Sequence, residues 1–265
     1  MSMTKSVVNL AIGRLVTTGA IPSIDEPVYR FYPEWRQGRK QEITLRHLLN
    51  HTSGLQDPGN SSDVERSPDA VRLALAAELS DPPGSRFAYN NKAVNLLSGT
   101  VQKLSGRRMD AFIRDEIFAP LGITDVAWEL DSAGNAFAYA GLMIRPEDLA
   151  KLGQLVLDGG RWGERQMIAR YPSLEAYIAA LRTTFGSKFW EPLGIALAPA
   201  RVQDLGRPEY GRMVGYEANG YLGQYLVIYP DQRVVAVRMV KPSARFNPTM
   251  DSSDSFRDLV RAVVR

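Results

Sequence analysis

ITLRHLLNHTSGL, residues 43–55, combines a helix start, an apolar face and a helix end in one short stretch. Thr44 is a typical N-cap for a helix over Leu45–Asn50, because a threonine hydroxyl can accept a backbone N–H of the first turn. The polar run His51-Thr52-Ser53-Gly54 then ends that helix. The stretch therefore predicts a short helix with defined ends.

The same stretch holds both histidines of the chain, His47 and His51. Their i, i+4 spacing could hold a metal ion, but no Glu follows His47 as the H-E-x-x-H pattern requires. We therefore predict that both histidines are structural, as isolated histidines usually are. The chain has no cysteine, which excludes disulfides, cysteine–zinc sites, iron–sulfur clusters and thiol nucleophiles. We expect no metal and no cofactor.

Outward from this stretch, helical patterns dominate the chain up to about residue 185, and strand-like patterns follow. Apolar periodicity predicts helices over 4–18, 69–79, 91–104, 109–118, 146–157 and 173–182. Strands are predicted over 194–198, 213–218, 221–229 and 234–240, with a hairpin turn at 230–232 and a closing helix over 255–264. This order indicates an α+β protein. We expect residues 1–185 to form a mostly helical lobe and residues 186–265 an antiparallel sheet with a C-terminal helix, the two lobes making one unit.

Composition and charge argue against several classes of protein, among them nucleic-acid-binding and membrane-spanning proteins. The 265 residues carry 32 Lys and Arg against 29 Asp and Glu, a net charge of +3 without a polybasic block, so no nucleic-acid partner is expected. No apolar run approaches the roughly 18–20 residues of a membrane helix. The first residues, MSMTKSVVNL, lack the charged region, apolar core and cleavage site of a signal peptide. As written, the chain is expected to be soluble and cytoplasmic; a longer N-terminus with a signal peptide would change that compartment.

The first candidate for chemistry is Ser2-Met3-Thr4-Lys5, which matches the pattern S-x-x-K. On a helix this spacing places both polar side chains on one face. A buried amine beside a hydroxyl can be neutral near pH 7, because desolvation lowers its pKa, and can then accept the serine proton. Alone the motif is weak, since any serine has a lysine three residues on about one time in twenty. The alternative is a frayed, solvated N-terminus.

Two more short motifs could contribute to a site. Tyr89 and Asn91 stand where the predicted helix over 91–104 opens; Tyr89 could relay protons and Asn91 could position a polar group, and the alternative is a tyrosine that only packs. Asn219, Gly220 and Tyr221 stand at the head of a predicted strand, where glycine allows the close approach of a substrate or of another backbone. The alternative there is a bulge or a tight bend.

In order and spacing, these motifs resemble the serine β-lactamase and penicillin-binding-protein superfamily, specifically its class C-like esterases, DD-peptidases and 6-aminohexanoate-dimer hydrolases. The resemblance runs along nearly the whole chain. It rests on SMTK (2–5), IDEPV (24–28), YPEW (32–35), ITLRHLLNHTSGL (43–55), FAYNN (87–91), AGL (140–142), RPEDLAKLG (145–153) and GYLGQY (220–225). It implies a β-lactamase/DD-peptidase-like fold, with a helical lobe and an antiparallel sheet flanked by helices.

The resemblance also implies roles for individual residues. Ser2 is similar to the acyl-accepting nucleophile of the family and Lys5 to its activating amine. Tyr89 and Asn91 are similar to the tyrosine and the asparagine of the Y-x-N element.

The third element of the family departs from its pattern in this chain. Ala218-Asn219-Gly220 occupies the place of the K-T-G triplet and lacks its lysine. Loss of that cation disfavours carboxylate-bearing substrates such as β-lactams or D-Ala-D-Ala peptides. The resemblance assigns the oxyanion hole to the backbone N–H groups of Ser2 and Tyr221, placed where negative charge develops on the carbonyl oxygen.

Members of the family carry an N-terminal helix and two strands before the S-x-x-K serine, and these strands complete a five-stranded antiparallel sheet. With the serine at residue 2, we expect the sheet to be incomplete at the N-terminus and a strand edge near Val234–Val240 to be uncovered. An uncovered edge favours pairing with a second copy of the chain, and so a homo-oligomer.

The function that the resemblance implies is a serine hydrolase that cleaves a small ester or amide, with a lactam or an amide oligomer among the candidates. Its intermediate would be an acyl-enzyme on Ser2, with Lys5 and Tyr89 as bases. Esters are favoured because their leaving group is better and the K-T-G lysine is missing. The alternative is a non-catalytic homologue that keeps the pocket and binds a peptide or a cell-wall-like ligand.

Overall fold

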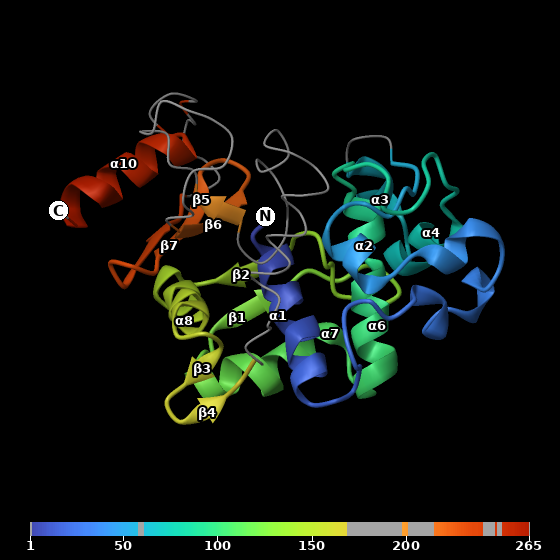
Figure 1. Cartoon of the computed structure of the whole chain (residues 1–265), viewed down its shortest axis with the longest axis horizontal. Coiled ribbons are helices and arrows are strands. Elements are labelled where there is room, and N and C mark those ends of the chain that lie inside the picture. The colour runs from blue at the N-terminus through green and yellow to red at the C-terminus, as the bar shows by residue number, and fades with distance from the viewer. Residues whose placement is uncertain are drawn as a thin grey trace.

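The computed structural model describes residues 2–57, 61–168, 198–200, 215–240, 247 and 251–264. Helix α1 (Thr4–Thr17) lies in the middle of the molecule, with a group of helices on one side and the larger β-sheet on the other (Figure 1). The expected α+β fold is therefore confirmed. The helix predicted over 173–182 and the expected lobe boundary after residue 185 lie outside the described residues.

The helical side is built from short elements between residues 28 and 121. The α-helices are α2 (Leu45–Leu49), α3 (Ser62–Arg66), α4 (Ala70–Ala76), α5 (Asn91–Val94), α6 (Leu96–Ser105) and α7 (Met109–Ile113). A π-helical turn, η4 (Arg114–Phe118), and a 3-10 turn, η5 (Ala119–Leu121), continue α7. Three more 3-10 turns precede α2: η1 (Val28–Arg30), η2 (Pro33–Trp35) and η3 (Gly38–Glu42).

The prediction of one helix over 91–104 is wrong, because Asn95 divides it into α5 and α6. The side-chain Nδ2 of Asn95 donates to the carbonyl of Asn91 at 2.9 Å, and its Oδ1 accepts the backbone N–H of Ala138 at 2.9 Å. Asn95 thus serves a tertiary contact at the point where the helix is interrupted.

The larger sheet contains four described strands in the order β5-β6-β7-β8, each antiparallel to its neighbour. These are β5 (Ala198–Ala200), β6 (Gly215–Gly220), β7 (Gln224–Tyr229) and β8 (Val234–Arg238). Helix α8 (Pro146–Leu157) packs on the face that carries Leu226, and α10 (Ser253–Val264) packs on the opposite face, where its Phe256 stacks on Tyr225. Within the described ranges, β8 pairs only with β7, so it forms an edge of the sheet there.

Two small hairpins were not predicted. Strands β1 (Val126–Trp128) and β2 (Leu142–Ile144) form one, and β3 (Arg161–Trp162) and β4 (Arg165–Gln166) form the other. Strands of two or three residues are too short to show an alternating pattern.

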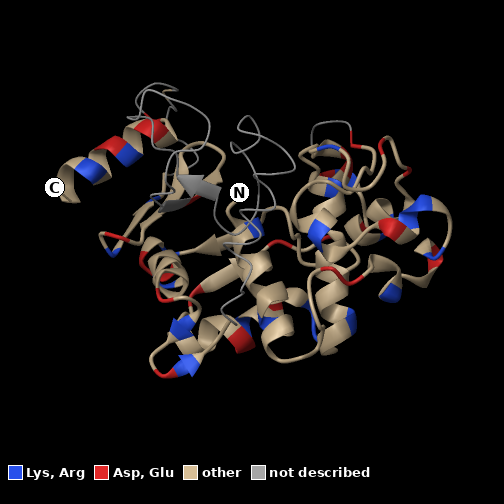
Figure 2. Cartoon of the chain, viewed as in Figure 1, with Lys and Arg blue, Asp and Glu red and all other residues tan. Residues whose placement is uncertain are grey.

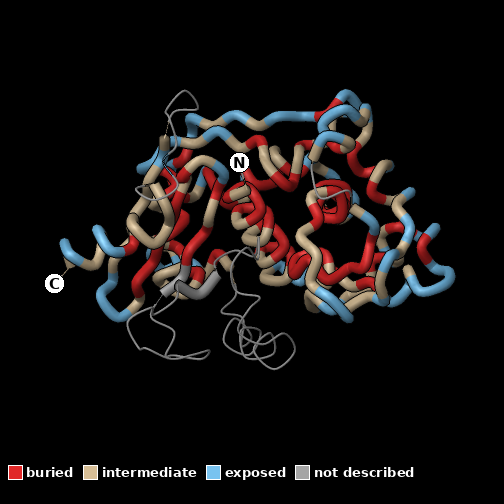
Figure 3. The backbone as a smooth tube through the Cα atoms, turned by 90° about the horizontal axis from the view of Figure 1, so that it is seen from above, coloured by how far each residue is buried: buried red, intermediate tan, exposed pale blue. Residues whose placement is uncertain are grey.

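Among the described residues, one large apolar core joins the two sides through α1. Figure 3 shows buried segments running from the helices across the centre to the sheet. The buried apolar residues of α1 are Val7, Val8, Ala11, Ile12 and Leu15, and they belong to the same cluster as residues of α6, α8 and β7. Because its buried apolar residues pack against both sides, α1 is held in place between them.

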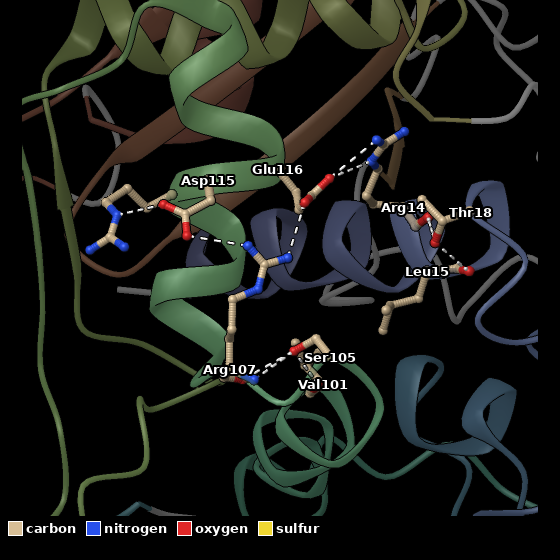
Figure 4. Close-up of polar contacts among 9 residues, drawn as sticks. Arg14, Leu15, Thr18, Val101, Ser105, Arg107, Asp115 and Glu116 are labelled. Carbon is tan, nitrogen blue, oxygen red and sulfur yellow. Dashed lines mark hydrogen bonds and ion pairs between the residues drawn. The ribbon is translucent and has the colours of Figure 1, made fainter.

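The C-terminal end of α1 is also fixed by ion pairs (Figure 4). Arg14 contacts Glu116 at 3.2 Å, and Arg107 bridges Glu116 and Asp115 at 3.0 and 3.2 Å. Arg14 also donates to the carbonyl of Met167 at 3.1 Å. These contacts tie α1 to the π-helical turn η4, and so they resist sliding of α1 along its axis.

Charged residues of both signs are interspersed over both sides of the molecule (Figure 2). This agrees with the scattered charges of the sequence. None of the described helices is both long and apolar enough to cross a membrane.

Candidate active site

The side chains of Ser2 and Lys5 meet at the start of α1. Lys5 Nζ lies 3.4 Å from Ser2 Oγ and donates to the backbone carbonyl of Tyr139 at 2.9 Å. Lys5 is 1% exposed and Ser2 is half-buried, so the start of this helix is packed and not frayed in solvent. The i, i+3 spacing brings the amine and the hydroxyl together as expected.

Burial changes the ionisation of the amine. Removal from water disfavours the charged form and lowers the pKa of Lys5 from 10.5 to about 7. A substantial part of Lys5 is therefore neutral at pH 7. With one N–H held by the carbonyl of Tyr139, the lone pair of the neutral amine is free to face Ser2.

Tyr89 contacts the same serine from the helical side. Its hydroxyl donates to Ser2 Oγ at 2.9 Å, and its ring centroid lies 4.7 Å from Lys5 Nζ. Burial raises the pKa of Tyr89, so it stays a neutral phenol at pH 7. Ser2 Oγ thus lies between an amine that can accept a proton and a phenol that can donate one.

The turn that carries Tyr89 is fixed by its neighbour Asn90, the N-cap of α5. Asn90 Oδ1 accepts the backbone N–H of Ala93 at 2.7 Å, and Asn90 Nδ2 donates to the carbonyl of Leu55 at 2.8 Å. The second bond links this turn to residues 43–55, the stretch that dominates the sequence pattern.

Asn91 is the first residue of α5, and its Oδ1 is buried without a hydrogen-bond partner in the described part of the chain. An unpaired buried oxygen is costly and usually has a ligand, a water or a functional reason.

The predicted residues of the sheet side lie at the end of β6. Asn219 donates to Glu217 Oε1 at 3.2 Å, while its own Oδ1 is buried and unpaired among described residues. Glu217 is fixed in turn by a buried ion pair with Arg257 of α10. Gly220 ends the strand opposite Gln224, and Tyr221 follows in the turn with its side chain 70% exposed.

Ala218 shows how this strand sits against α1. Together with Met3, Ser6 and Leu226 it lines an apolar cavity of about 10 Å³, so β6 packs directly against the first turns of α1. The structure places no hydrogen bond between Ser2 and residues 219–221 in the described regions. Ala218 stands where the family pattern has the lysine of K-T-G, and its methyl group supplies no positive charge.

Two contacts of this site were not predicted. The backbone carbonyl of Tyr139 accepts the Lys5 amine, and the ring of His51 lies against the ring of Tyr89 with centroids 4.4 Å apart. A backbone carbonyl carries no sequence signal of its own, although AGL at 140–142 marked the neighbouring segment. His51 was assigned a structural role, and the structure adds a direct contact with Tyr89.

His47 has the capping role that its position at the third residue of α2 suggests. Its backbone N–H donates to Thr44 Oγ1 at 3.3 Å, and its Nδ1 accepts the Thr44 N–H at 3.2 Å. In the regions described, no group of three or more His, Asp or Glu side chains could hold a metal ion.

Comparisons with known proteins agree with this architecture. Esterase EstB from Burkholderia gladioli is 33% identical over 145 residues, which cover 47% of this chain and 36% of the esterase. A Bacillus anthracis protein, provisionally assigned as a 6-aminohexanoate-dimer hydrolase, superposes with a TM-score of 0.75 at 18% identity over 99% of this chain and 72% of that one. A family VIII carboxylesterase superposes with a TM-score of 0.71 at 15% identity, covering 97% and 82% of the two chains.

The family model described as Beta-lactamase matches residues 1–251. The chain spans little more than a third of the length of EstB, so the match to this relative is partial. The match to the family model, in contrast, begins before α1 and ends two residues before α10. The resemblance drawn from the motifs is confirmed: the chain belongs to the beta-lactamase family.

Proposed function

We propose that this chain is a serine hydrolase that cleaves a small ester or amide through an acyl-enzyme on Ser2. The observation that carries the proposal is the position of Ser2 Oγ, 3.4 Å from Lys5 Nζ and 2.9 Å from the Tyr89 hydroxyl. The names of the relatives, an esterase and a carboxylesterase among them, support the same reaction class.

In the acylation step, neutral Lys5 accepts the proton of Ser2 while Ser2 Oγ bonds to the substrate carbonyl carbon. The Tyr89 phenol protonates the leaving group as its bond to that carbon breaks, and Tyr89 regains a proton from the Lys5 ammonium. Water then attacks the acyl-enzyme by the same route in reverse, which restores Ser2. Hydrogen bonds that are long without substrate, such as 3.4 Å from Lys5 to Ser2, commonly shorten when substrate binds.

Substrate binding is assigned to four more groups. The backbone N–H groups of Ser2 and Tyr221 would bind the oxyanion, and the side chains of Asn91 and Asn219 would bind polar atoms of the substrate. The unpaired buried Oδ1 atoms of both asparagines support this assignment, since each lacks a partner in the described residues. Because Ala218 supplies no cation, we expect uncharged esters and amides to react faster than carboxylate-bearing substrates.

Steady-state hydrolysis of p-nitrophenyl esters tests the proposal. Wild type should turn over, and Ser2→Ala should fall to the background rate with an unchanged thermal melt. Ser6→Ala is the matched control: it removes a hydroxyl four residues after Ser2, in the first turn of α1, at a residue that lines the apolar cavity. Ligand-dependent stabilisation of wild type without any turnover would contradict the proposal and favour the non-catalytic alternative.

A further inference from the structure

His51 contacts Tyr89 and both of its neighbours in the sequence, Ala88 and Asn90. Its backbone carbonyl accepts the N–H of Ala88 at 2.8 Å, and its Nδ1 accepts the N–H of Asn90 at 3.0 Å. Between these bonds its ring lies against the Tyr89 ring, 4.4 Å between centroids and inclined by 31°. One residue thus holds the backbone on both sides of Tyr89 and one surface of its ring.

The backbone of His51 is unusual for a residue with a side chain. It has a φ of 56°, in the left-handed region that most residues avoid and that Asn, Asp and His tolerate best. Such conformations cost free energy and persist where the surrounding structure enforces them, which is frequent at active sites. Here the conformation turns the chain at the end of α2, so that the carbonyl and the ring of His51 both face residues 88–90.

The ring of His51 is neutral and fully buried at 1% exposure. Burial and the nearby Lys5 lower the pKa of His51 to about 3. Because Nδ1 accepts the Asn90 N–H, the ring proton is on Nε2, which is buried and has no partner in the described regions. A neutral ring presents its flat surface to Tyr89 without adding a charge beside Lys5.

From these contacts we infer that His51 is a positioning residue for catalysis: it fixes the Tyr89 hydroxyl on Ser2 Oγ and takes no part in proton transfer itself. The inference rests on the proposed function and goes beyond the structural role expected for this histidine. The effect of His51 would pass through a single residue, because Tyr89 itself donates the 2.9 Å hydrogen bond to Ser2. Displacement of a reacting group by about 1 Å can cost about a hundredfold in rate.

His51→Asn is the most informative substitution. Asparagine tolerates the positive φ, and its Oδ1 stands where Nδ1 of histidine stands, so the bond from the Asn90 N–H can persist. The substitution removes the ring surface against Tyr89 and the edge contact with the Phe87 ring. We expect kcat for p-nitrophenyl ester hydrolysis to fall about tenfold, within the hundredfold range of a small displacement, with KM nearly unchanged. The matched control is His47→Asn, which alters a histidine with the same kind of Nδ1 bond in a helix cap, and should leave kcat unchanged.

A double-mutant cycle with Tyr89→Phe separates positioning from a general effect on the fold. If His51 acts through the Tyr89 hydroxyl, His51→Asn should reduce kcat in wild type and have no further effect when Tyr89 is phenylalanine. His51→Phe, which keeps a ring against residue 89 but removes the Nδ1 acceptor, is the second variant, and the same non-additivity is expected. Thermal melts accompany every variant, and either variant that remains folded completes the test.

Two results would overturn the inference: a kcat of folded His51→Asn within twofold of wild type, or losses that multiply in the double variant. Failure of the proposed function is a separate outcome, because it would show as absent turnover in wild type. Turnover in wild type together with an unaffected His51→Asn would overturn only the role of His51.

Discussion

At the scale of single residues, the proposed chemistry depends on the Lys5 amine, whose charged form is disfavoured by burial. Lys5 is surrounded by the apolar core, and its Nζ contacts only uncharged groups in the interactions described: Ser2, the carbonyl of Tyr139 and two aromatic rings. Without a neighbouring carboxylate the charged form is not compensated, so the amine gives up its proton near neutral pH. The same burial keeps Tyr89 protonated.

Substitution of the two proton-transferring residues should therefore remove catalysis and leave the fold. General acid–base groups typically contribute about 10²–10⁴-fold, so Lys5→Ala and Tyr89→Phe should each lower kcat/KM by that order. Alanine is a good helix former, and phenylalanine keeps the ring, so thermal melts should stay close to that of wild type. The combination of Lys5→Ala with Ser2→Ala should be no less active than Ser2→Ala alone. Near-wild-type rates for both single variants would move the chemistry to other residues.

The ionisation of Lys5 also sets the pH dependence. As pH falls below about 7, Lys5 gains a proton and loses its lone pair, so kcat/KM should fall about tenfold per pH unit on the acid side. Above pH 7 the rate should reach a plateau that extends past pH 9, because the raised pKa of Tyr89 keeps its proton in place. The measurement is kcat/KM from pH 5 to 9.5, corrected for spontaneous hydrolysis. A rate that declines between pH 7 and 9 would contradict these assignments.

At the scale of elements, most of the longer helices could be predicted from the sequence, and so could the proximity of Ser2 and Lys5. Thr44 capped α2 as expected, α8 matched its predicted bounds, and the S-x-x-K spacing brought Ser2 and Lys5 together. The break at Asn95 was missed because it depends on a tertiary bond to Ala138 that local periodicity cannot reveal. The same holds for the carbonyl of Tyr139 in the site, since its role comes from the fold and not from its side chain.

Gly153 shows how closely helix α8 packs on the sheet. A Cβ at this position of α8 would lie 2.5 Å from Val235 Cγ1 of β8 and 3.0 Å from Leu226 Cδ1 of β7. Glycine in a helix interior normally costs about 0.8–1.0 kcal/mol relative to alanine, so its presence indicates that close helix–sheet packing is worth more. α8 could not approach the sheet as closely with any larger residue.

Gly153→Ala should accordingly destabilise the protein despite its better helix propensity. Overpacking of this kind costs about 1–3 kcal/mol, which exceeds the gain in propensity. In a Val235→Ala background the closest methyl group is gone and only the contact with Leu226 Cδ1 remains, so the same Gly153→Ala change should be much less destabilising. Urea unfolding of the four proteins measures both effects. Equal effects of Gly153→Ala in the two backgrounds would show that contact with Val235 is not the cause.

At the scale of the whole molecule, α1 is the element on which both sides depend. It carries Lys5 directly after the turn that holds Ser2, contributes its apolar face to the core shared by helices and sheet, and is fixed at its far end by Arg14. Tyr89 approaches from the helical side and β6 packs from the sheet side, so the candidate site lies where the two sides meet.

The edge strand β8 gives a prediction at the same scale. Among the residues described, the backbone groups on the outer side of β8 have no strand beside them, and such edges promote pairing between chains. We therefore expect the chain to self-associate in solution. Light scattering after size-exclusion chromatography should give a mass that rises above the 29.4 kDa of one chain as concentration increases. A mass that stays at 29.4 kDa at every concentration would contradict this expectation.

The central claim is that Ser2 is the nucleophile, and covalent labelling tests it most directly. A fluorophosphonate phosphorylates an activated serine, with loss of fluoride, and leaves an unactivated one unmodified. Intact mass spectrometry of the treated protein should show one adduct, and peptide mapping should place it on Ser2. Ser2→Ala should remain unlabelled, and Lys5→Ala should react far more slowly. No adduct on wild type, or an adduct that persists in Ser2→Ala, would contradict the account.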